Sequence, residues 1–394
     1  MVRKPRSRRP AATRSRKAET PAAPLTEAQL KRKVKARPAL KKPKAVTLRF
    51  DRMLAGAPKV RHKTTKRPKS LIARPHAKAK SGSGLDLQIE VAGAELGTRV
   101  FRPDISGTRV PLPRMTAKMR RDARMGLPDL DGHLPDHLPL QPVPPQLDRA
   151  LRVRPFVNAF SRSKTQRRAT TVFWPEDRYT FSDTAFPWCT VGRVDTAGGW
   201  ASGVLIGPRH MLTCSHAMVW GSGNSAGWVR FRPSFFDGNA PFGEAWATRW
   251  YAFRKVFGPN IDATEAREDY VVLVLDRRIG DTCGWMGSRT YSESWDGGTF
   301  WRHIGYPGDM AGGQRPSYER DIALDGRNNS THRQVWHRGD IWPGQSGGPF
   351  FAWWSGENWP RVVCVQSWEN NQRNGASGGS RLVDLIIRAR NDFP

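Results

Sequence analysis

The sequence predicts an all-β fold, a barrel or a sandwich, for residues 170–394, and no packed core before them. From about residue 169 onward, short apolar runs alternate with turns rich in Gly, Pro, Asn and Asp, a pattern typical of such strands. All 16 tryptophans lie at Trp174 or later, and all four cysteines lie at Cys189 or later. Because large aromatic side chains bury much apolar surface, we expect the core in this part of the chain.

Residues 1–84 are predicted to be a disordered basic tail. The first 80 residues hold 27 Lys or Arg and 3 Asp or Glu, a net charge of +24 out of the +30 of the 394-residue chain. Such a block of like charges repels itself and stays unfolded. Two interpretations stay open, a solvated tail and an arm that binds nucleic acid or another anionic surface through its charges. An organelle transit peptide ranks below both.

Residues 85–169 are predicted to be a Pro-rich linker, a pro-segment or a strap across the folded part. Residues 85–91 alternate apolar and polar side chains, which indicates a short strand. Residues 129–137 contain three Asp and two His, residue types that bind metals. Prolines interspersed among and after them favour an extended linker instead, so we predict no metal site and no cofactor.

The C-terminus departs from the strand pattern. In residues 381–390, apolar side chains recur at helical spacing, which predicts a helix packed on the body. The four cysteines are too sparse and too widely spaced for a zinc site, and we expect buried free thiols. No apolar run is long enough to span a membrane. The start of the chain has no apolar stretch after its charges, so no secretory signal is predicted.

Residues 344–349 (GQSGGP) offer Ser346 as a candidate nucleophile, although such a cluster is also typical of a simple turn. Small neighbours admit a substrate carbonyl and let the main-chain N–H groups of Gly344 and Ser346 converge on a developing oxyanion. A serine hydroxyl needs a base. Upstream, His216 follows one apolar run and Asp269 begins another. The chain order His, Asp, Ser is one known order of the Ser-His-Asp machinery.

With these motifs, residues 170–394 resemble trypsin-like serine proteases, in particular the bacterial glutamyl-endopeptidase-like branch. The resemblance is carried by the segments around His216, Asp269 and Ser346 and by WPEDR at 174–178, FPW at 186–188, PFGE at 241–244, GWMG at 284–287 and GYPGD at 305–309. It implies two antiparallel β-barrels, divided near residue 285, with the site in the cleft between them. It further implies protein or peptide substrates and secretion, a location that the missing signal does not support; otherwise a cytoplasmic location is expected. We expect a monomer.

The resemblance also implies a role for each site residue. His216 is the general base, Asp269 orients it, and Ser346 attacks the peptide carbonyl to form an acyl-enzyme. Gly344 and Ser346 supply the oxyanion hole. Gln345 stands where trypsin has an aspartate that pairs with a freed N-terminus, so that activation switch does not work here in the usual way.

Substrate preference is expected to depend on Asp340, Ser367, Trp368 and Glu369. Asp340 stands where trypsin has an aspartate at the base of its primary specificity pocket, and Ser367 with Trp368 resembles the segment that binds the substrate backbone. Glu369 replaces the usual glycine of that segment. Gln366 stands where glutamyl endopeptidases place a histidine that receives glutamate. Two acids at the pocket favour a basic substrate side chain by Coulomb attraction.

The competing hypothesis is a non-catalytic protein that binds polyanions through the basic arm and uses the protease-like body as a scaffold. Fold alone does not exclude it. An intact set of three catalytic residue types favours the serine endopeptidase, because a scaffold does not need them. His210 is a rival for the general base, but it precedes a strand-like segment and is expected in a turn.

Overall fold

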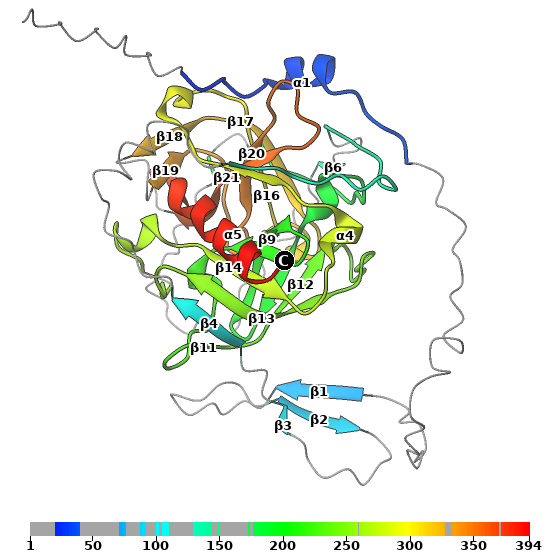
Figure 1. The fold of residues 1–394 in the computed structure, drawn as a ribbon, viewed down its shortest axis with the longest axis vertical. Coiled ribbons are helices and arrows are strands. Elements are labelled where there is room, and N and C mark those ends of the chain that lie inside the picture. Colours follow the sequence, from blue (N-terminus) through cyan, green and yellow to red (C-terminus); the bar gives the residue numbers. More distant parts are fainter. Residues whose placement is uncertain are drawn as a thin grey trace, which may run out of the picture.

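The computed structural model describes residues 20–39, 71–75, 87–91, 100–101, 105–109, 129–143, 148–149, 172–173, 176–258, 260–327, 333–369 and 372–394. Strands dominate these residues and form two large sheets, with one helix lying across them (Figure 1). The predicted all-β fold is therefore confirmed. Most of the basic segment 1–80, including any anion-binding arm, lies outside the described residues, as do residues 150–171.

The first sheet closes into a six-stranded barrel in which every neighbouring pair of strands is antiparallel. Its circular order is β8, β9, β10, β14, β13, β12. The bounds are β8 (Val191–Thr196), β9 (Gly199–Gly207), β10 (His210–Thr213), β12 (Val229–Pro233), β13 (Ala245–Ala252) and β14 (Val271–Leu275). The short strands β4 (Ile105–Arg109) and β11 (Ser225–Ala226) extend the sheet beside β13.

Strand β14 shows why a continuous apolar run belongs in this barrel. All five of its residues are buried. Side chains alternate between the two faces of a strand, and here both faces meet apolar neighbours. Val271, Leu273 and Leu275 join one core cluster, whereas Val272 and Val274 join another that also contains the C-terminal helix. The run therefore links the barrel interior to the interface with the rest of the body.

The second sheet is an open half-barrel that follows the order β18, β19, β22, β21, β20, β16, β17, β7, β6. Beyond β14, β15 pairs with β21, so the proposed division near residue 285 falls between β14 and β15. The bounds are β5 (Asp129–Leu130), β6 (Asp148–Arg149), β7 (Tyr179–Thr180), β15 (Gly287–Arg289), β16 (Trp301–Gly305), β17 (Ser317–Ile322), β18 (Leu324–Arg327), β19 (Arg333–His337), β20 (Pro349–Ala352), β21 (Arg361–Glu369) and β22 (Asn374–Gly378). A separate sheet joins β1 (Leu71–Pro75), β2 (Leu87–Val91) and β3 (Val100–Phe101).

The helices are few and short, apart from the last. Helix α5 (Ser380–Asp392) forms where the sequence predicted a C-terminal helix, and it buries Leu382, Leu385, Ile386 and Ala389 against the strands (Figure 1). The other α-helices of the described residues are α1 (Glu27–Lys33) and α4 (Gly280–Cys283). The 3₁₀ helices are η1 (Trp188–Thr190), η2 (Ser215–Ala217), η3 (Glu265–Arg267), η4 (Glu293–Trp295) and η5 (Ala311–Gly313).

Residues 20–39 differ from the predicted disordered tail, because they dock on the half-barrel. The N–H of Leu25 donates to the carbonyl of Trp353 at 2.7 Å, and two tryptophan indoles donate to the carbonyl of Ala22. Helix α1 begins with a capping box formed by Thr26 and Gln29. Its Leu30 is completely buried. The apolar side chains of this segment find a tryptophan-rich surface far away in sequence, which offsets the cost of ordering a basic chain.

Residues 129–143 form a strap beside α1. Strand β5 pairs with β15, and Leu140 bridges Arg37 on one side and Phe186 on the other. The acids and histidines that suggested a metal site have protein partners. Asp131 accepts from Arg361, and His133 lies with its ring centre 4.5 Å from that of Trp285. The described residues contain no group of three His, Cys, Asp or Glu able to hold a metal ion.

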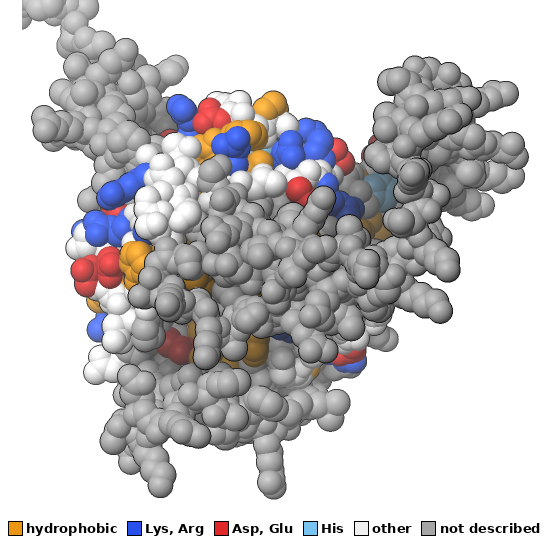
Figure 2. Space-filling view, turned by 90° about the horizontal axis from the view of Figure 1, so that it is seen from below, with side chains coloured by type: hydrophobic (Ala, Val, Ile, Leu, Met, Phe, Trp, Pro, Cys, Tyr) orange, Lys and Arg blue, Asp and Glu red, His pale blue; other side chains and the backbone are white. Residues whose placement is uncertain are grey.

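Charges of both signs are mixed on the body, as its near balance of acidic and basic residues requires. Where the face in Figure 2 is not covered by grey atoms, Lys and Arg side chains lie among Asp and Glu side chains.

All four cysteines are buried and free. Among the helices of the described residues, none has the length and apolarity needed to cross a membrane.

The docking of α1 makes a stability prediction. Leu30→Ala should lower the free energy of unfolding of the full chain by about 2–5 kcal/mol, the usual cost of truncating a buried leucine. Arg32→Ala, on the exposed face of the same helix, is the matched control and should change it by less than about 0.5 kcal/mol. Urea unfolding followed by tryptophan fluorescence measures both. Equal midpoints for the two variants would mean that α1 does not pack on the body.

Candidate active site

The pairing of β10 with β14 brings the candidate base and acid together. Thr213, at the end of β10, lies opposite Val271, at the start of β14. His216 follows β10 within η2, and Asp269 precedes β14 by two residues. Because the strands are antiparallel, the chain leaving one and the chain entering the other meet at the same edge of the barrel. The barrel therefore positions both side chains at one end.

Asp269 is a buried acceptor for three donors. Its Oδ1 atom accepts from the main-chain N–H of His216 at 2.8 Å, and its Oδ2 atom lies 2.6 Å from Nδ1 of His216. The hydroxyl of Ser367 also donates to Oδ2, at 2.6 Å. The Asp269 side chain is not exposed to solvent. Three donors on a buried carboxylate hold the imidazole in one orientation, with Nδ1 toward the acid.

Asp269 also sets the proton affinity of His216. Burial lowers the pKa of His216, but the charge of Asp269, the thiol of Cys214 and the hydrogen bonds to both outweigh burial, and the pKa is raised well above 6.5. The other ring nitrogen, Nε2, lies 3.7 Å from the Sγ atom of Cys214. Nε2 is the ring nitrogen that is not bonded to Asp269, and it is the atom that would exchange a proton with a substrate or a nucleophile.

The loop of Ser346 is fixed by the conformation of a glycine and by hydrogen bonds from Ser202. Gly344 has a φ of +106°, and a Cβ atom there would lie 2.3 Å from the carbonyl oxygen of Tyr306. Glycine is therefore required at this position. Ser202 anchors the loop with two hydrogen bonds. Its N–H donates to the carbonyl of Ser346, and its hydroxyl donates to the carbonyl of Gly344.

One pocket of about 480 Å³ brings most of the predicted site residues together. It is lined by His216, Asn260, Ile261, Ile341, Trp342, Pro343, Ser346, Gln366, Ser367, Trp368 and Glu369. The hydrogen bonds of His216 in the structure end on Asp269 and Cys214, so His216 and Ser346 line the same pocket without a direct hydrogen bond. Catalytic hydrogen bonds are often long in the absence of substrate and shorten when it binds.

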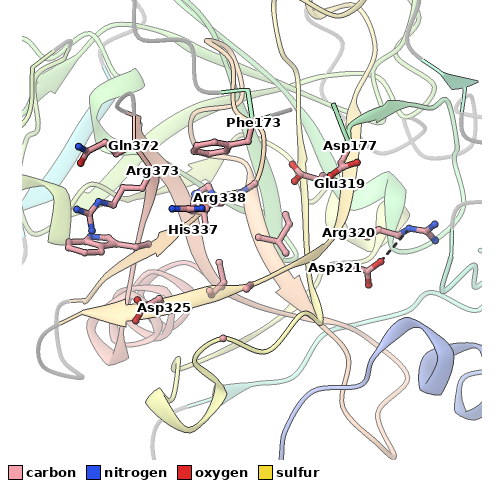
Figure 3. A pocket seen from close by; sticks show the side chains of 16 residues that line it. Phe173, Asp177, Glu319, Arg320, Asp321, Asp325, His337, Arg338, Gln372 and Arg373 are labelled. Carbon is pink, nitrogen blue, oxygen red and sulfur yellow. Dashed lines mark hydrogen bonds and ion pairs between the residues drawn. The ribbon is translucent and has the colours of Figure 1, made fainter. Parts of the chain in front are cut away.

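Asp340 lies away from this pocket. Its two carboxylate oxygens accept from the main-chain N–H groups of Phe173 and Asp177, at 2.6 and 3.0 Å. Its own N–H donates to the carboxylate of Glu319 at 2.8 Å. Phe173, Asp177 and Glu319 line a different pocket, of about 960 Å³ (Figure 3). A preceding segment of the chain thus supplies the hydrogen-bond donors of the Asp340 carboxylate, and its place at the base of the specificity pocket stays a prediction.

Burial raises the pKa of Asp340 to about 6, against the two N–H groups that lower it.

His210, the rival base, is fully buried, with Nε2 bonded to the carbonyl of Ala389 at 3.2 Å. Burial lowers the pKa of His210 to about 4. A neutral imidazole held against α5 serves packing, and it lies outside the pocket that contains Ser346.

Residues 201–357 match a family model described as a trypsin-like peptidase domain. Glutamyl endopeptidase of Bacillus licheniformis is 27% identical to this chain over 225 residues. That match covers 56% of this chain and 66% of the relative, just under two thirds of its length. The resemblance that the motifs indicated, to trypsin-like proteases of the glutamyl-endopeptidase-like branch, is confirmed.

Two solved structures are similar in arrangement to the trypsin-like domain. A glutamyl endopeptidase in complex with MPD is 23% identical, with a TM-score of 0.45, and the match covers 55% of this chain and 97% of that one. The protease Anisep of Arthrobacter nicotinovorans is 20% identical, with a TM-score of 0.38, and the match covers 53% of this chain and 99% of that one.

Proposed function

We propose that this protein is a serine endopeptidase that hydrolyses peptide bonds with Ser346, His216 and Asp269. The observation that carries the proposal is the 2.6 Å hydrogen bond between a buried Asp269 and His216, a residue that lines the same pocket as Ser346. The trypsin-like domain supports the same reaction class. A hydrolytic role for these residues needs no group beyond the chain itself and water.

In the proposed reaction, His216 Nε2 takes the proton of the Ser346 hydroxyl while Oγ attacks the substrate carbonyl carbon. The resulting imidazolium is stabilised by the Asp269 carboxylate, which keeps its charge throughout. The imidazolium then gives its proton to the leaving amine, and the acyl-enzyme forms. Water repeats the same steps and releases the acid product, which restores Ser346.

The main-chain N–H groups of Gly344 and Ser346 are proposed to bind the oxyanion. Donors fixed before the reaction stabilise the developing charge without a cost of reorganisation. The anchors from Ser202 support this role, because they fix the carbonyls of Gly344 and Ser346 and so hold the main chain of this loop in place.

We further propose a preference for a basic side chain before the scissile bond, recognised by Glu369. Glu369 is the one carboxylate among the described residues that line the pocket of Ser346, and His216 is the one cationic type among them. Opposite charges attract more strongly in a partly buried pocket than in water. A pocket of this composition does not favour the glutamate substrates named for the Bacillus relative.

Glu369→Gln should therefore change the preference of the enzyme. In matched peptides with Arg or Glu before the scissile bond, the ratio of kcat/KM values should fall roughly 10- to 100-fold, the worth of one charged hydrogen bond. Asp340→Asn is the matched control, since Asp340 is not among the residues that line this pocket, and it should leave the ratio unchanged. A ratio that responds to Asp340→Asn and not to Glu369→Gln would contradict the assignment.

The proposal is tested by labelling the full chain with a fluorophosphonate probe, which reacts with activated serines. Mass spectrometry of the labelled chain should find the adduct on Ser346. His216→Gln should abolish labelling, whereas His210→Gln should leave its rate within a few-fold of the unaltered protein, because the buried His210 lies outside the pocket. Absence of label from the unaltered full chain, or label on another serine, would contradict the proposal.

A further inference from the structure

The side chain of Arg178 lies buried just before β7, behind the loop of Ser346. None of it is exposed to solvent. Its Nε and Nη2 atoms donate to the two carboxylate oxygens of Glu176, both at 2.7 Å. Its Nη1 and Nη2 atoms donate to Asp309, at 3.2 and 2.7 Å. A third acceptor is the side-chain oxygen of Gln345, 2.9 Å from Nη1. Arg178 therefore has a hydrogen bond to the residue directly before the proposed nucleophile.

Gln345 passes this contact on to the loop. Its Oε1 atom accepts from Arg178 and also from the main-chain N–H of Trp342, at 2.9 Å. Its Nε2 atom lies 3.3 Å from Nδ1 of His303. Burial, together with His337 and Arg178, lowers the pKa of His303 well below 6.5, so this ring is neutral. Its Nδ1 atom accepts a hydrogen bond from the amide of Gln345. The side chain of Gln345 thus closes the turn that contains Gly344.

Asp309 ties a second loop to the same guanidinium. The neighbouring Gly308 donates its N–H to the carbonyl of Pro343 at 2.9 Å. Tyr306, in the same loop, provides the carbonyl that closely faces Gly344. Arg178 consequently reaches residues 342–345 by two routes, directly through Gln345 and indirectly through the loop of Asp309.

The charges explain why residue 345 is neutral. One guanidinium already faces two carboxylates, Glu176 and Asp309. A third carboxylate at position 345 would be buried without a compensating cation, at a cost of several kcal/mol. A glutamine keeps the acceptor oxygen for Arg178 and adds a donor for His303. The arrangement is complete with groups from within the folded chain and does not involve a freed N-terminus.

We infer that Arg178 is a positioning residue that holds the oxyanion loop 342–345 in its active conformation in the uncut chain. This inference rests on the proposed serine endopeptidase function. It adds that the loop is built by an internal cation, so cleavage of the chain is not needed to form the oxyanion hole.

The test compares three variants of the full chain. Arg178→Met removes the guanidinium, and Gln345→Met leaves Arg178 its two carboxylates but removes the link to the loop. Arg361→Met is the matched control, because Arg361 is also buried and is also paired with carboxylates, those of Glu357, Asp131 and Asp129. The acylation rate constant is measured with p-nitrophenyl acetate. The proton NMR signal of the His216–Asp269 hydrogen bond reports separately on the triad.

Arg178→Met and Gln345→Met should each lower the acylation rate roughly 10²–10³-fold, the loss expected for a missing oxyanion donor. Both should keep the NMR signal of the His216–Asp269 bond. Arg361→Met should stay within a few-fold of the unaltered chain. If Arg178→Met does not fold, Gln345→Met decides the question. The unaltered chain should acylate while electrophoresis shows it uncut.

Three results would overturn the inference while leaving the proposed function intact. In the first, the unaltered chain is active and both variants acylate at its rate. In the second, Arg361→Met loses as much activity as they do, so that the loss reflects general destabilisation. In the third, the chain becomes active only after cleavage. If no form of the unaltered protein acylates, cut or uncut, the proposed function itself fails, and the inference fails with it.

Discussion

Replacing Ser346 by alanine should lower turnover of peptide substrates by on the order of 10⁶. The hydroxyl is the only group of the protein that forms a covalent bond to the substrate in the proposed mechanism, and alanine removes it without adding bulk. The side chain lies in a pocket with His216, and the loop around it is anchored through main-chain groups that alanine retains. The fold and substrate affinity should therefore survive. Initial rates measured over a range of substrate concentrations should show a loss in kcat with little change in the dissociation constant.

The control for this experiment is Ser294→Ala, which truncates an exposed serine and should leave kcat unchanged. Residual activity of Ser346→Ala should exceed that of water alone by the amount that binding and the oxyanion hole supply, about 10³–10⁴. A variant that keeps a tenth or more of the original turnover would show that another group attacks the substrate. A variant that loses activity only because it unfolds would be recognised by its lowered unfolding midpoint.

The β-strands of the body and the C-terminal helix could be predicted because their signals are local. A run such as 271–275 has no polar residue, and the helix repeats its apolar side chains every three or four positions. Each of the motifs around His216, Asp269 and Ser346 is a short continuous segment, so it can be recognised in the sequence. What joins them in the structure is the pairing of β10 with β14, which the sequence does not show directly.

The docked segment 20–39 could not be predicted, for two physical reasons. Helix α1 has only seven residues, and its few apolar side chains stand in a run of Lys and Arg that is typical of disorder. The surface that receives it is formed by Trp295, Trp353 and Trp354, more than 250 residues further along the chain. Contacts of such long range leave no periodic pattern in the sequence of either partner.

Asp340 and Arg178 show a different limit. The offset of six residues from Ser346 locates Asp340 in the chain, but the donors that orient its carboxylate come from residues 173 and 177. Arg178 belongs to the WPEDR motif used for the resemblance, and its position against Gln345 becomes visible only when the two segments fold together. The one signal in the sequence is Gln345 itself, which stands where trypsin has an aspartate and so indicates that this loop is held in a different way.

Asp269→Asn is the second replacement with a large expected effect, a fall in kcat of about 10⁴ at neutral pH. The amide keeps the volume of the carboxylate but removes its charge. The amide nitrogen is a donor, so it favours the imidazole tautomer that carries its proton on Nε2. In that tautomer Nε2 cannot accept the proton of Ser346. Ser367 and the N–H of His216 also lose part of the acceptor that they share.

The pH profile separates this effect from simple misfolding. In the unaltered chain, Asp269 raises the pKa of His216 well above 6.5. The base must be neutral to act, so activity should rise with pH and reach its plateau only above that pKa. In Asp269→Asn the charge that raises the pKa of His216 most is gone while the burial that lowers it remains, and the acid limb of kcat/KM should move to lower pH. An acid limb at the same pH in both proteins would mean that Asp269 does not set the basicity of His216, and the proposed triad would lose its orienting acid.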